Sequence, residues 1–296
     1  MVYLNGSFIQ KDKAYISVMD RGFLFGDGVY EVFPTYNKNI FGLDSHLNRL
    51  QDGLDAINIK NPHSKNEWIN LINKLLSFDT INTNQAIYLQ VSRGCDEDRK
   101  HTHGNLKPTV YLQSTSISPR IKDNLLKGKS AISRDDIRWS QCNTKATSLL
   151  ANIMYAQEAK ENNSEEAILC RNGIVTEGAS SNVFIVKNNC IFTHPKSPNI
   201  LPGITREIVI DCAKNLNLKV KEVTFNKNAL MSADEVWITS STREILPITL
   251  IDNLKINTGN AGPLWSIIYD SYQDSKNINS ANSERVFEKI KSTAKN

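Results

Sequence analysis

Hydrophobic residues recur along the first part of the chain with the spacings of short strands and of two helices. Short strand-like segments at residues 2–4 and 7–10 flank Asn5-Gly6, a dipeptide typical of a two-residue hairpin turn. Residues 29–36 are rich in β-branched and aromatic side chains and predict a strand. Apolar residues then repeat at steps of three and four, which predicts an amphipathic helix. They are Leu43, Leu47, Leu50, Leu54 and Ile57.

A second helix and two further strands complete this part of the chain. Ser64-x-x-Glu67 has the form of a capping box ahead of an apolar-periodic run, so we expect a helix there. Residues 86–93 and 109–115 have the composition of strands. The polar, lysine-bearing segment 118–130 follows, and we place a domain boundary between residues 118 and 119.

The second part of the chain alternates strand and helix patterns. Four strands are expected, at residues 166–170, 174–176, 183–186 and 236–240. Asn172-Gly173 joins the first two as a second hairpin signal. Helices are expected over residues 149–157 and 203–216. Beyond Asp274 the chain is rich in asparagine, serine and lysine, which predicts a surface helix and a tail.

Composition narrows the class of protein. The chain has 296 residues, a length that favours two domains, and its 40% apolar and 22% charged residues are ordinary for a soluble globular protein. The net charge of 35 − 31 = +4 is scattered, so we expect neither a nucleic acid nor a membrane as partner. No secretion signal or membrane-length apolar run occurs, and the cytoplasm is the expected compartment.

The five cysteines predict neither a disulfide framework nor a metal site. They are odd in number, widely spaced and free of any Cys-x-x-Cys pair, and several lie in apolar runs where cysteine packs as a small hydrophobic residue. They are Cys95, Cys142, Cys170, Cys190 and Cys212. No metal is expected.

Lys145 is the first candidate for chemistry. It comes just before a predicted helix and is flanked by the small residues Thr144, Ala146 and Thr147. A lone lysine is most often a surface charge. Small neighbours, however, leave room for a cofactor aldehyde, and partial desolvation favours the neutral, nucleophilic amine.

Two further motifs suit a pyridoxal cofactor. Glu177 lies beside a glycine and two serines between two predicted strands, unlike a core pattern. A carboxylate there can hold the protonated pyridine nitrogen, so that the ring accepts electrons released from the substrate's Cα. Residues 201–206, Leu-Pro-Gly-Ile-Thr-Arg, open a predicted helix, whose backbone amides and threonine hydroxyl can cradle a phosphate. Such helix starts are common, so this motif is weak by itself.

Together these motifs resemble the fold-type IV, class IV family of pyridoxal-phosphate enzymes, which includes D-amino-acid aminotransferases, branched-chain aminotransferases and aminodeoxychorismate lyase. The likeness runs from about residue 2 to about residue 252. It is nearest to the D-amino-acid branch in the segments Asp-Arg-Gly, Phe-Gly-Asp-Gly-Val-Tyr-Glu-Val, Asp-Ile-Arg-Trp, Glu-Ala-Ile-Leu-x-Arg-Asn and Thr-Glu-Gly-x-Ser-Ser-Asn-Val-Phe. Taken alone, the first two segments would be a glycine-rich turn entering a strand.

The resemblance implies an α+β chain with two domains. A small α/β sandwich domain with a substrate-carboxylate loop would occupy residues 1–118. A larger domain with a mixed sheet or pseudo-barrel would bind the cofactor and occupy residues 119–296, including the tail. The family also implies a homodimer in which the carboxylate loop reaches into the neighbouring subunit's site.

The resemblance also implies which residues contact pyridoxal 5′-phosphate. Lys145 would hold it as a Schiff base and move a proton between the substrate's Cα and C4′ of the cofactor, and Glu177 would pair with the ring nitrogen. Four residues would hold the phosphate, namely Arg49, Ile204, Thr205 and Ser241. Three more would lie near the ring, namely Ser180, Ser181 and Leu201.

Residues 93–101 resemble the loop that traps the α-carboxylate of the substrate in the D-amino-acid branch. The resemblance implies that Arg99 and His101 form the trap with Tyr30, because a guanidinium can grip a carboxylate through two hydrogen bonds. Without the family context, a polar loop whose acids and bases pair with one another is the simpler interpretation. The loop is one residue longer than usual, with three acids at 96–98 beside the arginine.

The implied reaction is a ping-pong transamination from a D-amino acid such as D-alanine to a 2-oxo acid such as 2-oxoglutarate. The alternatives in the same fold are a branched-chain L-amino-acid transaminase, an aminodeoxychorismate lyase and an (R)-amine transaminase. The Arg99 and His101 pair favours the D-amino-acid branch, since those relatives build the carboxylate site differently or lack it. A cofactor-binding protein without turnover is an alternative from another class, against which intact Lys145 and Glu177 argue.

Overall fold

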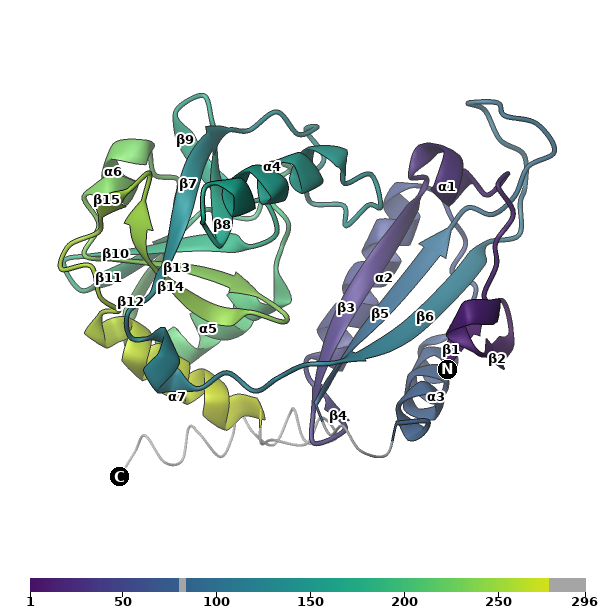
Figure 1. Ribbon diagram of the computed structural model, residues 1–296, viewed down its shortest axis with the longest axis horizontal. Coiled ribbons are helices and arrows are strands. Elements are labelled where there is room, and N and C mark those ends of the chain that lie inside the picture. Colours follow the sequence, from purple (N-terminus) through teal and green to yellow (C-terminus); the bar gives the residue numbers. More distant parts are fainter. Residues whose placement is uncertain (80–83, 277–296) are drawn as a thin grey trace. The chain divides into compact units, whose positions relative to one another are not determined.

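The computed structural model describes residues 1–79 and 84–276, and these fall into two compact units (Figure 1). The first unit comprises Met1–Pro119 together with Thr144–Leu149. The second comprises Arg120–Asn143 and the chain from Leu150 onward. Lys145 therefore belongs to the first unit, although the chain on both sides of its segment belongs to the second.

The first unit is built on a six-stranded antiparallel sheet with the order β2-β1-β6-β5-β3-β4. Its strands are β1 (Val2–Leu4), β2 (Ser7–Ile9), β3 (Gly28–Tyr36), β4 (Asn39–Ile40), β5 (Gln85–Ser92) and β6 (Thr109–Ser116). The predicted hairpin at Asn5-Gly6 is confirmed, since both residues have positive φ angles and Leu4 pairs with Ser7.

Two predicted helices, α2 (Leu43–Ala56) and α3 (Lys65–Ser77), pack against this sheet. The leucine spacing places Leu47, Leu50 and Leu54 on the buried face of α2. The capping box of α3 is present, because Ser64 and Glu67 each accept a hydrogen bond from the other's backbone N–H. A cap of this kind stabilises a helix by about 1 kcal/mol.

The glycine-rich segment before β3 contains a short helix, α1 (Arg21–Phe25), which the sequence pattern does not predict. The Asp20 carboxylate caps it by accepting a hydrogen bond from the Gly22 N–H at 2.8 Å. Gly26 ends it with a φ of 66°, a conformation that favours glycine. At Gly28 a Cβ would lie 2.7 Å from the Val91 carbonyl oxygen, so the pairing of β3 with β5 requires glycine there.

The second unit contains a nine-stranded mixed sheet with the order β12-β11-β10-β13-β14-β7-β8-β9, to which β15 adds beside β14. The strands are β7 (Lys129–Asp135), β8 (Glu166–Arg171), β9 (Ile174–Gly178), β10 (Asn182–Lys187), β11 (Cys190–Thr193), β12 (Lys219–Glu222), β13 (Glu235–Ser240), β14 (Glu244–Ile251) and β15 (Leu254–Lys255). The sheet curls so that its edge strand β9 also contacts β10, which agrees with the expected mixed sheet or pseudo-barrel.

The longer helices of this unit are α4 (Leu150–Glu161), α5 (Ile204–Asn215) and α7 (Pro263–Lys276), with the short α6 (Lys227–Met231). Helices α5 and α7 pack on each other and on β13 (Figure 1). Glu235 fixes the start of α7 by accepting hydrogen bonds from the N–H groups of Leu264 and Trp265. The tail expected beyond α7 lies outside the described residues.

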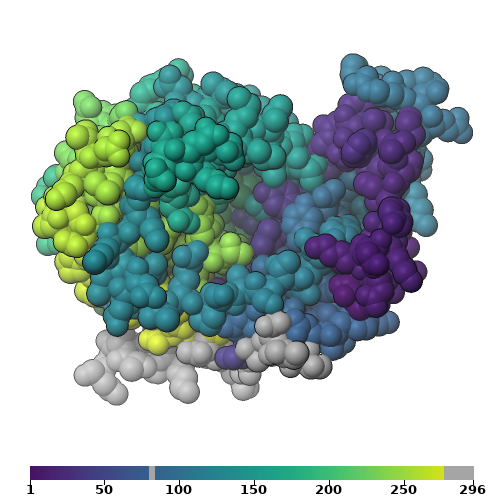
Figure 2. Space-filling view, in the orientation of Figure 1, coloured from purple at the N-terminus to yellow at the C-terminus, as the bar shows by residue number. Residues whose placement is uncertain are grey.

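Helix α4 forms where the pattern predicts it, but its most apolar residues lie at the surface. Leu150, Ile153 and Met154 are 73%, 61% and 56% exposed. The buried face instead carries Tyr155 and Ala159, which pack in a small core with residues of β8. The segment containing α4 forms a teal area of the surface in Figure 2. An apolar face of this kind often marks a contact with another chain.

Among the described residues, no helix is long and apolar enough to cross a membrane. The same residues contain no group of three or more His, Cys, Asp or Glu side chains that could hold a metal ion.

Candidate active site

Lys145 is anchored on the first sheet beside Tyr30. Val29 and Ala146 form an isolated antiparallel bridge, and the Tyr30 N–H donates to the Lys145 carbonyl at 3.0 Å. The Lys145 side chain is half-buried, and its Nζ lies 4.2 Å from the centre of the Tyr30 ring. Pairing of Lys145 and the two residues after it with β3 therefore holds the backbone that carries the amine.

Arg49 is buried on α2, where Glu31 of β3 holds its guanidinium. Nε donates to Oε1 of Glu31 at 2.7 Å, Nη2 donates to Oε2 at 2.9 Å, and His46 Nδ1 lies 2.7 Å from the same Oε2. Burial alone would raise the pKa of Glu31, but Arg49 and His46 hold it well below its ordinary value. The sequence carries a signal for this triad, since two polar residues three positions apart interrupt the buried face of a helix.

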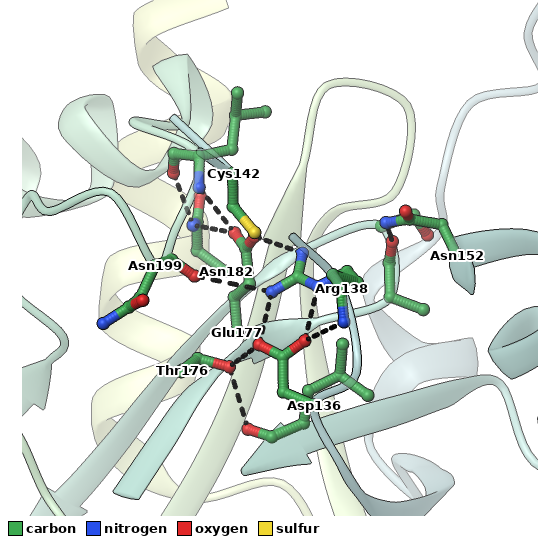
Figure 3. A network of polar contacts seen from close by, with 12 residues as sticks. Asp136, Arg138, Cys142, Asn152, Thr176, Glu177, Asn182 and Asn199 are labelled. Carbon is green, nitrogen blue, oxygen red and sulfur yellow. Dashed lines mark hydrogen bonds and ion pairs between the residues drawn. The ribbon is translucent and has the colours of Figure 1, made fainter. Parts of the chain in front are cut away.

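Glu177 is a buried carboxylate of β9 that accepts three hydrogen bonds (Figure 3). Arg138 Nη1 donates to Oε1 at 2.6 Å, while Asn182 Nδ2 and the Leu201 N–H donate to Oε2 at 3.0 and 2.9 Å. Burial raises the pKa of Glu177 to about 7, and the Arg138 guanidinium works against that rise. All three partners are hydrogen-bond donors, so they favour the ionised carboxylate and oppose the effect of burial.

Asn182 connects Glu177 with the start of α5. Its Nδ2 also donates to the Leu201 carbonyl at 2.8 Å, and its Oδ1 would lie only 2.0 Å from a Cβ placed on Gly203. Glycine is therefore required at 203, because any side chain would displace the amide that holds Glu177. Helix α5 begins directly after it with the buried Thr205 in its first turn, where unpaired N–H groups can bind a phosphate.

Ser180 and Ser181 lie in a polar cluster around the buried Glu166. Ser181 Oγ donates to the Glu166 carboxylate at 2.8 Å and Ser180 Oγ lies 3.3 Å from the same oxygen. Arg243 Nη2 donates to that oxygen at 2.6 Å and to Ser180 Oγ at 2.7 Å. Arg243 is in the turn between β13 and β14 that also contains Ser241, so this turn is tied to the two serines.

Arg99 and His101 both lie near the Phe25 ring of α1. The Arg99 Cζ lies 4.9 Å from the centre of that ring, and the centre of the His101 ring lies 5.7 Å from it. Arg21 holds the loop backbone by donating to the carbonyl of His101 at 3.0 Å and to the preceding carbonyl at 2.6 Å. No hydrogen bond, ion pair or ring contact joins Tyr30 to Arg99 or His101 within the described part of the chain.

The predicted residues thus form separate groups. Lys145 and Tyr30 lie together in the first unit, where Arg49 is held by Glu31. Glu177 and Leu201 lie together in the second unit. Several residues that hold these groups in place have no role in the sequence-based prediction. Glu31, Asp136, Arg138 and Asn182 lie in the quoted family motifs without an assigned function, and His46 and Arg243 lie outside them.

Comparison with known proteins identifies similar chains. A family model described as amino-transferase class IV matches residues 28–251. A D-alanine aminotransferase of Bacillus licheniformis is 40% identical over 275 residues, which cover 93% of this chain and 96% of the relative. A D-alanine aminotransferase of Listeria monocytogenes serovar 1/2a is 38% identical over 290 residues, covering 97% and 99%.

A solved structure shares the fold. It is the branched-chain amino acid aminotransferase from Escherichia coli. The TM-score is 0.83 and the identity 24%, with 91% of each chain covered. At that identity the likeness concerns the fold alone.

The triad of Glu31, Arg49 and His46 predicts a pH-dependent stability. In Glu31→Gln, the buried Arg49 loses the charge of Glu31, and we expect the free energy of unfolding at pH 7 to fall by about 3–5 kcal/mol. The folded pKa of Glu31 is depressed, so its contribution is fully present above the unfolded pKa of about 4.5 and is lost progressively as the pH falls from there through the folded pKa. The difference from wild type should therefore shrink at acid pH.

Urea unfolding of both proteins at pH 7 and at about pH 3.5 measures this difference. Asp44→Asn serves as the control, because Asp44 forms an exposed pair with Lys65 and its loss should change stability by less than about 1 kcal/mol. A difference between Glu31→Gln and wild type that stayed the same at both pH values would contradict an origin in the charge.

Proposed function

Because the chain belongs to the class IV aminotransferase family, we propose that it transfers the amino group of a D-amino acid such as D-alanine to a 2-oxo acid such as 2-oxoglutarate, with pyridoxal 5′-phosphate as its cofactor. The observation that carries the proposal is the near full-length similarity to two D-alanine aminotransferases. The branched-chain alternative is supported at the level of the fold, at 24% identity.

The donor set fits pyridoxal 5′-phosphate. When bound, the cofactor supplies an aldehyde that takes the amino group and a protonated ring that draws electrons from the substrate's Cα. Glu177, surrounded by donors, would hold the ring nitrogen's proton through its ionised carboxylate. The half-buried Lys145 amine would reach the aldehyde and then take the Cα proton.

We assign the phosphate to Arg49, Ile204, Thr205 and Ser241. Two observations support this: the first turn of α5 begins after a glycine that allows close approach, and Arg49 is oriented by Glu31. Three further residues, Leu201, Ser180 and Ser181, are assigned to the surroundings of the ring. Leu201 is held against Glu177 through its N–H, and the serines follow Glu177 in the β9–β10 turn.

Tyr30, Arg99 and His101 are assigned to the α-carboxylate of the substrate. With the carboxylate on these residues, the Cα–H of a D-amino acid would point toward Lys145. An L-amino acid would have to exchange its carboxylate and side chain, which leaves a carboxylate and an arginine without partners and costs several kcal/mol. This assignment is the basis of the expected preference for D-substrates.

The trap residues also support a homodimer. Among the described residues, no hydrogen bond, ion pair or ring contact joins Arg99 or His101 to Tyr30, so we infer that the loop of a second copy completes the trap. Helix α4 offers a surface for that copy, since Leu150, Ile153 and Met154 are exposed. The exposed Ile137 lies beside the helix, because its N–H donates to Tyr155 Oη.

A substrate panel with 2-oxoglutarate tests the proposed function. D-alanine, D-aspartate or D-glutamate should be turned over far faster than L-leucine or L-valine.

Arg99→Ala tests the assigned carboxylate site. It should lower kcat/KM for D-alanine by about 10- to 150-fold, which corresponds to the loss of a charged hydrogen bond of about 1.5–3 kcal/mol. Lys100→Ala is the matched control, because this exposed neighbour pairs with Asp98 and should leave kcat/KM unchanged. Rapid turnover of L-leucine with little of any D-amino acid would replace the proposal with the branched-chain alternative.

Sedimentation at micromolar concentration tests the dimer. Wild type should sediment with about twice the chain mass of 33.3 kDa, and Ile153→Glu should shift it toward the monomer with loss of activity. Leu254→Glu, at another exposed apolar position on β15, should leave the dimer intact. A fully active wild-type monomer would disprove the shared trap, and a dimeric Ile153→Glu would exclude α4 from the interface.

A further inference from the structure

Asp136 is a fully buried carboxylate that follows β7 and is surrounded by donors (Figure 3). Its Oδ1 accepts a hydrogen bond from Arg138 Nε at 2.9 Å, and its Oδ2 accepts one from Arg138 Nη2 at 2.9 Å. Thr176 Oγ1 donates to Oδ2 at 3.0 Å, and Arg171 Nη2 lies 3.2 Å from it. Such surroundings hold Asp136 in its charged form, and its pKa is lowered by Arg138 against the opposing effect of burial.

Arg138 is shared unequally between two carboxylates. Asp136 receives the paired Nε and Nη2 hydrogen bonds, which is the strongest arrangement between a guanidinium and a carboxylate. Glu177 receives a single hydrogen bond from Nη1. Arg138 therefore fixes the position of Glu177 while it shares its charge with Asp136.

Because Arg138 is shared, both Arg138 and Asp136 affect the pKa of Glu177. Burial raises its pKa, Arg138 lowers it, and Asp136 raises it again. If Asp136 were neutral, Arg138 would act on Glu177 without compensation. A carboxylate neutralised by a guanidinium is a poorer partner for a second cation.

We propose that Asp136 is a positioning residue that competes with Glu177 for the charge of Arg138 and so keeps the negative charge of Glu177 available to the ring nitrogen of the cofactor. The inference rests on the proposed function, because that nitrogen belongs to pyridoxal phosphate. It predicts that neutralising Asp136 makes the ring nitrogen lose its proton at lower pH and slows removal of the Cα proton.

The first test uses the protein without cofactor. The pKa of Glu177 is followed in infrared difference titrations, with its carboxyl band assigned by Glu177→Gln. Asp136→Asn should lower this pKa by about one pH unit relative to wild type, and Arg138→Gln should raise it. The double variant Asp136→Asn/Arg138→Gln should lie below Arg138→Gln. Asp135→Asn is the control, since Asp135 is an exposed neighbour and should leave the pKa unchanged.

The comparison of the double variant with Arg138→Gln keeps the test decisive if Asp136→Asn fails to fold. The double variant buries no uncompensated charge from this pair, and the difference between the two still isolates Asp136. An equal pKa of Glu177 in these two variants, or in wild type and Asp136→Asn, would overturn the inference.

The second test uses the loaded enzyme and ¹⁵N-labelled pyridoxal phosphate. In Asp136→Asn the ring ¹⁵N signal should change to the unprotonated shift at lower pH than in wild type, and kcat for D-alanine should fall with little change in KM. Unchanged ¹⁵N titration and kcat in an otherwise active enzyme would overturn the role of Asp136 alone. A wild-type protein that neither binds pyridoxal phosphate nor turns over D-alanine would overturn the proposed function itself.

Discussion

The burial of a carboxylate at Glu177 is the constraint on which much of the second unit depends. A buried charge must be paired and hydrogen-bonded. Each hydrogen-bond partner of Glu177 is itself held in place by other residues. Arg138 is held by Asp136, and the Leu201 N–H is placed by the loop that leads into α5. Asn182 requires glycine at 203. The position of Glu177 is thereby linked to the position of the first turn of α5, which is proposed to hold the phosphate.

In the first unit, different interactions position Lys145 and Arg49. Its sheet holds Lys145 through backbone pairing with β3, so the amine does not depend on a helix of its own for its position. On the neighbouring helix, Arg49 is kept in place by Glu31, which is itself fully buried. In both units a charged side chain proposed to bind the cofactor is oriented by a buried partner of opposite charge.

Local patterns in the sequence predict most of the regular elements, because leucine spacing, a capping box and Asn-Gly turns act within a few residues. They do not predict that Thr144–Leu149 pairs with β3, which depends on contacts between residues more than a hundred positions apart. Lys145 and Glu177 stand out through family motifs. Asp136 and Asn182 also lie in family motifs, but the motifs do not reveal their roles, because these depend on which side chains they contact. The spacing on α4 indicates a helix and cannot tell a core face from an exposed one.

The ionised carboxylate of Glu177 as partner of the ring nitrogen is the central claim of this account, and single-turnover kinetics of Glu177→Gln with D-alanine test it most directly. The amide keeps the shape of the side chain and removes its charge. The account predicts a folded protein that still binds pyridoxal phosphate but whose chemical step is slowed by about 10²-fold or more. A wild-type single-turnover rate in Glu177→Gln would contradict it.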